Sequence, residues 1–123
     1  MKVAYLVTSY RNPGQVLRLV SALREGPGSE VVVSHSQDQS RLEAHEVEAR
    51  GGHLLPHRRG PVRWGSWAYL RSLLDGFAWM AERFDPDWTV VLSGQDYPLR
   101  PLSEIESFFA STDFDALLGA VHE

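Results

Sequence analysis

The chain has 123 residues, of which 43% are hydrophobic and 23% charged, and its formal net charge is −4. This length and balance fit one domain with a core of its own, and the mixed charges give no basic surface for nucleic acid or anionic membrane. Without cysteine, neither a disulfide nor a thiolate metal site can form. The apolar run at residues 3–7 is too short for a signal sequence or an integral membrane segment, so a cytoplasmic location is expected.

Strand and helix patterns alternate along the whole chain. Short apolar runs typical of buried strands occur at residues 3–7, 31–33, 51–56 (the weakest), 88–92 and 115–119. Helical or polar segments separate them, at residues 13–23, 40–50, 66–84 and 103–109. This order predicts an α/β fold with a mainly parallel sheet, in which the strands at 2–8, 30–34 and 87–92 are adjacent or nearly so.

Three helices carry more specific signals. Asn12 is an N-cap candidate with Pro13 at the first helical position, and Ser103 with Glu106 form a capping-box pattern. The clearest helix has large apolar residues at helical spacing, which predict a single buried stripe. Its members are Trp67, Leu70, Leu74, Phe77, Met80, Ala81 and Phe84.

Polar segments follow three of the predicted strands. They are T-S-Y-R-N, S-H-S-Q-D and S-G-Q-D-Y-P, and the loop that contains W-G-S is expected to join them. In parallel sheets ligands bind outside the carboxyl ends of the strands, which is where these segments fall. In the last of them, Gly94 allows close approach of a ligand or a positive φ, and Asp96 offers an acceptor for sugar hydroxyls. The alternative is an ordinary loop in which Asp96 caps backbone amides.

Other patterns favour structural interpretations. D-P-D at residues 85–87 is similar to a metal-binding Asp-x-Asp, but it lies at the amino end of its strand and reads as a helix-terminating turn. His53 and His57 are separated by Pro56, which makes a zinc-binding helical pair a poor interpretation. Arg58, Arg59 and Arg63 could contact a diphosphate or form a solvated basic loop.

Three stretches, in this order, resemble the core-2/I-branching β-1,6-N-acetylglucosaminyltransferases, glycosyltransferase family 14. They are M-K-V-A-Y-L-V-T-S-Y-R-N-P with the following L-R-L-V-S-A-L, then V-R-W-G-S-W-A-Y-L, then V-V-L-S-G-Q-D-Y-P-L-R-P with E-I-E-S-F-F. The resemblance covers nearly the whole chain, and the W-G pair with S-G-Q-D-Y-P at this spacing is its most specific part.

The resemblance implies a Rossmann-like nucleotide-sugar-binding fold of the GT-A type. It also implies transfer of a sugar, typically N-acetylglucosamine from UDP-N-acetylglucosamine, to a hydroxyl of an acceptor glycan. The family inverts the anomeric centre without a metal, using basic side chains against the diphosphate. The expected partners are therefore a UDP-sugar donor and a carbohydrate acceptor, with no metal or other cofactor.

The candidate substrate-binding set combines this resemblance with the strand ends. It consists of Thr8, Tyr10, Asn12, His35, Arg63, Trp64, Gly65, Ser66, Gly94 and Asp96. The family usually carries an I-H-x-D type sequence after its second strand. Here V-S-H-S-Q-D aligns His35 but places Gln37 where the acid stands, with Asp38 one position further on.

The family's catalytic carboxylate and diphosphate-binding basic residues lie in a half that these 123 residues do not contain. The resemblance thus implies that residues 1–123 are the N-terminal, donor-binding part of an incomplete transferase domain, inactive alone. The apolar surface that the other half would cover is expected to promote self-association into homo-oligomers. A non-catalytic sugar-nucleotide-binding or interaction module is the main alternative. A different nucleotide-binding α/β enzyme is less favoured, since no phosphate loop is visible.

Overall fold

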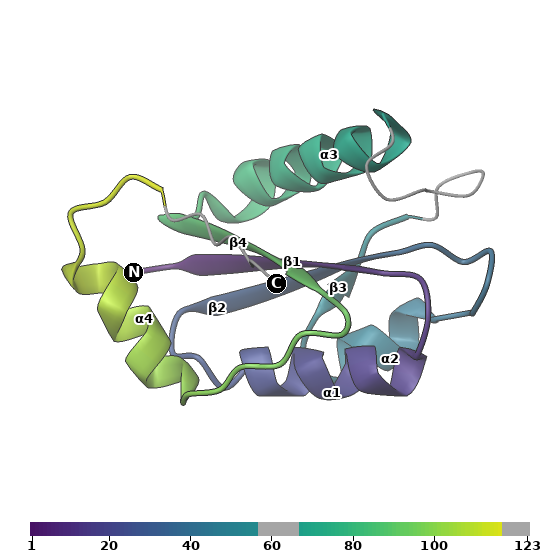
Figure 1. The fold of residues 1–123 in the computed structure, drawn as a ribbon, viewed down its shortest axis with the longest axis horizontal. Coiled ribbons are helices and arrows are strands. Elements are labelled where there is room, and N and C mark those ends of the chain that lie inside the picture. The colour runs from purple at the N-terminus through teal and green to yellow at the C-terminus, as the bar shows by residue number, and fades with distance from the viewer. Residues whose placement is uncertain (57–66, 117–123) are drawn as a thin grey trace, which may run out of the picture.

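A computed structural model describes residues 1–56 and 67–116 of the chain. Its centre is a four-stranded parallel sheet of order β3-β2-β1-β4 (Figure 1). The strands are β1 (Val3–Ser9), β2 (Ser29–His35), β3 (His53–Leu54) and β4 (Trp88–Ser93). The helices are α1 (Pro13–Leu23), α2 (Ala44–Ala49), α3 (Trp67–Phe84) and α4 (Leu102–Ser111). The predicted α/β class and the parallel neighbours of β1 are confirmed.

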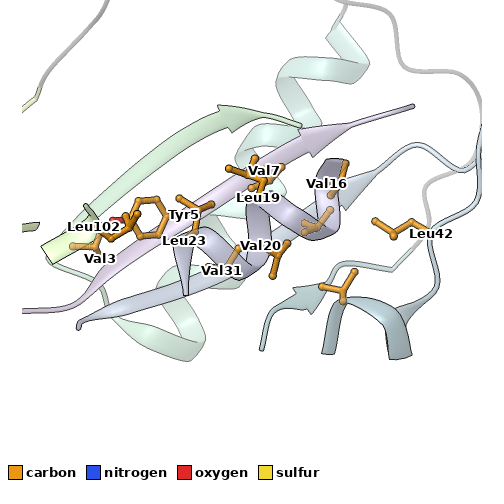
Figure 2. Close-up of a cluster of buried hydrophobic side chains, with 12 residues drawn as sticks. Val3, Tyr5, Val7, Val16, Leu19, Val20, Leu23, Val31, Leu42 and Leu102 are labelled. Carbon is orange, nitrogen blue, oxygen red and sulfur yellow. The ribbon is translucent and has the colours of Figure 1, made fainter. Parts of the chain in front are cut away.

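The sheet is covered on both faces. On one face, α1, α2 and α4 lie below the sheet in Figure 1, and Val3, Tyr5 and Val7 of β1 pack with α1 side chains such as Leu19 (Figure 2). On the other face α3 lies across β1 and β2, where Met80 packs against Leu6 and its neighbours. The apolar character of β1 on both faces follows from this double covering.

The buried stripe predicted for α3 is correct only in part, since Phe77 and Phe84 pack against the core beside Met80. Met80 is fully buried, but Leu74 is 51% exposed and Trp67 68% exposed. The most deeply buried residues of α3 are Ser72, Gly76 and Met80. The partly buried Leu73, Phe77, Trp79 and Phe84 also pack against the core on this face. At Gly76 a Cβ atom would lie 2.8 Å from Leu6 Cδ2, so a small residue is needed where α3 approaches β1 most closely.

The capping-box prediction for α4 is also wrong. The N-cap of α4 is Pro101, and Glu106 is 3% exposed inside the fold. Its Oε1 accepts a hydrogen bond from the Gly28 N–H at 2.8 Å, and its Oε2 accepts one from the Tyr5 hydroxyl at 3.1 Å. Burial, reinforced by this carboxylate, raises the pKa of Tyr5 far above its ordinary value. Glu106 therefore fastens α4 to the amino end of the sheet.

The remaining helix and turn predictions have mixed outcomes. Asn12 is the N-cap of α1, but it adopts a left-handed φ of 53° and its side chain makes no capping hydrogen bond. The polar helix is shorter than residues 40–50 suggested, since α2 spans Ala44–Ala49. Asp85 ends α3 with a φ of 47°, which confirms that D-P-D is a helix-terminating turn. Of the predicted last strand, residues 115 and 116 are not in a strand, and 117–119 lie outside the described residues.

Among the described helices, none is both long enough and apolar enough to cross a membrane.

Candidate functional site

The carboxyl ends of β1, β2 and β4 bring several candidate residues to one edge of the sheet. Thr8 stands in register between Ser34 of β2 and Ser93 of β4. The Gly94 N–H donates a hydrogen bond to the Thr8 carbonyl oxygen at 2.8 Å, so the segments T-S-Y-R-N and S-G-Q-D-Y-P are joined directly. The sequence prediction that these segments meet therefore agrees with the structure.

Gly94 is required by the packing of the chain itself. A Cβ atom at this position would lie 2.8 Å from Ser9 Cβ and 3.0 Å from Val16 Cγ2. The loop after β4 is thus pressed against the end of β1 and the first turns of α1. Gly94 is buried and has no positive φ, so close approach of backbone segments is the reason for glycine here.

Asp96 closes the turn that follows β4. Its Oδ2 accepts a hydrogen bond from the Ser93 N–H at 2.8 Å, and the Ser93 hydroxyl accepts one from the Gln95 N–H at 3.2 Å. This is the amide-capping role that the sequence left open. The residue is nevertheless exposed, so its carboxylate can still be reached from solvent.

His35 connects the ends of β1 and β2 to the loop that follows. Its Nδ1 lies 2.7 Å from the Ser9 hydroxyl, and its Nε2 lies 2.9 Å from the Ser40 carbonyl oxygen. Because a carbonyl can only accept, Nε2 carries the proton and Nδ1 accepts a hydrogen bond from Ser9. The Ser40 hydroxyl in turn donates to the Tyr10 carbonyl at 2.9 Å. A sugar nucleotide could form a hydrogen bond with the imidazole of His35 only by displacing Ser9 or Ser40.

Burial lowers the pKa of His35, although its hydrogen bond to Ser40 opposes that shift. A histidine with a lowered pKa in the folded protein binds fewer protons than in the unfolded chain. Its contribution to stability is therefore present above the ordinary pKa of about 6.5 and is lost as the pH falls below it.

We predict that the free energy of unfolding falls between pH 7 and pH 5, by at most about 1.4 kcal/mol per pH unit from this one group. Urea titrations of the wild type, His35→Gln and His45→Gln at several pH values would measure it. The exposed His45 is the matched control and should leave the fall unchanged, whereas His35→Gln should reduce it. Equal pH dependence in all three proteins would show that His35 does not carry the effect.

The candidate set divides by accessibility. Tyr10, Asn12 and Asp96 are exposed at this edge, and the Arg11 guanidinium lies 5.3 Å from the centre of the Tyr10 ring. His35 and Gly94 are buried beneath them and hold the edge together. The predicted residues Arg63, Trp64, Gly65 and Ser66 lie outside the described residues, as does the joining role given to their loop. Sequence reasoning missed Ser9 and Ser40, because their contact with His35 depends on the register of β1 against β2.

A shallow depression of about 720 Å³ lies at the opposite edge, at the amino ends of the strands. Its lining mixes charges of both signs, from Lys2, Arg24, Glu30, Asp85 and Asp87. The Lys2 N–H donates to Asp87 Oδ2 at 2.8 Å, so part of this charge is already paired within the protein. Over residues 1–56 and 67–116, no three histidine or acidic side chains cluster as metal ligands would.

No protein-family model matches this sequence, and a search of curated proteins finds none that is significantly similar.

Proposed function

We propose that the chain is the donor-binding part of an inverting, metal-independent glycosyltransferase of the GT-A type. The transferred sugar is N-acetylglucosamine from UDP-N-acetylglucosamine, and the acceptor is a glycan hydroxyl. The observation that supports this most is the hydrogen bond from Gly94 to Thr8. It joins the two segments that carry the family resemblance, at the edge of a parallel sheet where nucleotide ligands bind.

The exposed residues of this edge suggest how a donor would be held. The Tyr10 ring offers a flat surface for a base or sugar, and the Asn12 amide and Asp96 carboxylate offer hydrogen bonds. Thr8, His35 and Gly94 keep these groups in place through backbone and buried contacts. Arg63 to Ser66 complete the proposed set by resemblance.

Transfer needs two further groups. A general base must take the proton of the acceptor hydroxyl, and positive charge must stabilise the departing diphosphate. By resemblance both belong to the family's second half, so we propose that the 123-residue chain binds the donor weakly and does not turn it over. A non-catalytic sugar-nucleotide-binding or interaction module is the second candidate, since the hydrogen bonds described at this edge join its loops to one another.

Titration with UDP-N-acetylglucosamine, followed by NMR, tests the proposal. Neutral hydrogen bonds contribute about 0.5–1.5 kcal/mol each, so a dissociation constant of about 1 mM is expected. Shifts should centre on the amides of Tyr10, Asn12 and Asp96, and Tyr10→Ala should weaken binding several-fold. The matched control is Phe108→Ala, which removes an exposed aromatic ring from α4 instead. Adding EDTA should leave the dissociation constant unchanged, because no metal takes part in the proposed binding.

An assay of transfer to a β-galactoside acceptor, run in parallel, is expected to show no product. Turnover by these 123 residues would overturn the proposed position of the catalytic groups. Shifts confined to the amino-end depression, around Lys2 and Asp87, would overturn the proposed site itself. Donor binding by a full-length protein that never transfers sugar would favour the non-catalytic module.

A further inference from the structure

Counting only contacts among residues 1–56 and 67–116, the outer edge of β4 has free backbone groups. Within the described residues β4 pairs with β1 and ends the sheet on that side. On the side that faces β1, the Trp88 N–H donates to the Lys2 carbonyl and the Gly94 N–H donates to the Thr8 carbonyl. Since alternate residues of a strand direct their N–H groups to opposite sides, those of Thr89, Val91 and Ser93 point outward, away from β1.

One of these outward groups is already used. The Ser93 N–H donates to Asp96 Oδ2, so the Asp96 carboxylate closes the carboxyl end of the edge. Among residues 1–56 and 67–116, the outward N–H groups of Thr89 and Val91 have no hydrogen-bond partner. The part of the edge that can still accept another strand therefore runs from Thr89 to Val91.

The side chains of this edge do little to prevent pairing. Natural edge strands are commonly protected by lysine, proline or inward charges. The residues of β4 are W-T-V-V-L-S, which include neither a charge nor a proline, and Val91 is 41% exposed. An edge of this kind is suited to another strand with an uncharged sequence.

The surface beside the edge is also apolar. Trp79 of α3 lies against His53 of β3, with ring centres 5.8 Å apart. The opposite flank of α3, which carries the exposed Leu70 and Leu74, is therefore turned toward the β4 side of the sheet. Thr89 and Val91 share that face of the sheet, because they stand in register with Ala4 and Leu6 beneath α3.

We propose that the outer edge of β4 binds β4 of a second copy of the chain, antiparallel about a two-fold axis. In this arrangement Val90 faces Val90, and Thr89 of each copy exchanges backbone hydrogen bonds with Val91 of the other. This register uses both free N–H groups and leaves the Asp96–Ser93 hydrogen bond intact. A register centred on Val91 would require the Ser93 N–H, which Asp96 already holds.

A second copy is the occupant that this sequence fits best. The two-fold axis places β-branched Thr89 and Val91 side by side on the α3 face, a favourable cross-strand pair. Residues 88–92 carry no charge, so the paired stretch itself places no like charges opposite each other. A two-fold contact also closes on itself, so that it produces a dimer with one continuous sheet and not a fibre.

Sedimentation equilibrium over a wide range of protein concentration tests the proposal. The wild type should dimerise, and Val91→Pro should raise the dissociation constant at least about tenfold, because each copy loses one interchain hydrogen bond. Proline is tolerated here because the Val91 N–H points away from β1. Val91→Lys should act similarly, and Val91→Thr is the matched control that should still dimerise.

Hydrogen exchange identifies which backbone groups are paired. The Thr89 and Val91 amides should gain protection as the concentration rises, with circular dichroism confirming that each variant is folded. A protein that remains monomeric at millimolar concentration would overturn the proposal. So would a dimer that survives Val91→Pro but is lost in Leu74→Lys, since it would form through α3. Concentration-independent protection of the two amides in a monomer would show that the chain covers its own edge.

Discussion

Replacing Glu106 with alanine is expected to destabilise the fold by about 2–5 kcal/mol. The change leaves two groups without a partner, the buried Tyr5 hydroxyl and the half-buried Gly28 N–H, and the loss of a buried partner costs about 1–3 kcal/mol. That loss is a large share of the 5–15 kcal/mol typical of a domain. Urea denaturation of the wild type and Glu106→Ala, at neutral pH, would measure the difference.

Two further variants separate the hydrogen bonds from the volume of the side chain. Glu106→Gln keeps an oxygen for Gly28 and an amide that can donate to Tyr5, so it should cost clearly less than the alanine change. Gly26→Ala leaves Glu106 unchanged but places a Cβ atom 1.7 Å from its Oε2, which must move the carboxylate away. It should therefore resemble Glu106→Ala. Wild-type stability in Gly26→Ala would contradict the proposed role of this contact.

The core of the fold could be predicted from the sequence because its signals are local. Short β-branched runs such as Val31 to Val33 alternate with helical segments, and right-handed crossovers then leave few arrangements of the strands. The interior role of Glu106 could not be predicted in this way. An acid near the start of a helix can either complete a capping box or accept hydrogen bonds in the interior. Which of the two roles Glu106 has depends on Gly28 and Tyr5, which are distant in sequence.

The candidate site shows the same division. The sequence correctly brings Thr8 and Gly94 to one edge, since both follow strands of a parallel sheet. It does not reveal that the Asp96 carboxylate is bound to Ser93, or that both ring nitrogens of His35 have partners. These contacts depend on strand register and on the path of a loop. For Asp96 and His35, the observed hydrogen bonds indicate a structural role at this edge of the sheet more directly than they indicate contact with a ligand.

The stripe predicted for α3 is only partly correct, because the size of a side chain is a poor guide to burial where a helix lies close to a sheet. Where α3 lies over Leu6 there is room only for a small side chain, and the residue at that point is Gly76. Ser72, one turn earlier, is another small buried residue. The larger residues Leu70 and Leu74 then fall on a flank. A helical pattern identifies an apolar side of a helix, but which side faces the sheet depends on the fit between the two surfaces.

This orientation predicts unequal effects for two alanine substitutions on the same helix. Met80→Ala should lower the free energy of unfolding by about 2–5 kcal/mol, because Met80 is fully buried against Leu6 and Val32 and its loss leaves a cavity. Leu74→Ala should cost about 1 kcal/mol or less, because half of that side chain is already in solvent. Both changes lead to alanine at an interior helical position, so helix propensity contributes almost nothing to the difference.

Urea denaturation of the two variants at a low protein concentration, where self-association is minimal, gives the comparison. Equal losses would mean that Leu74 is covered in solution and that α3 packs on the sheet through a different face.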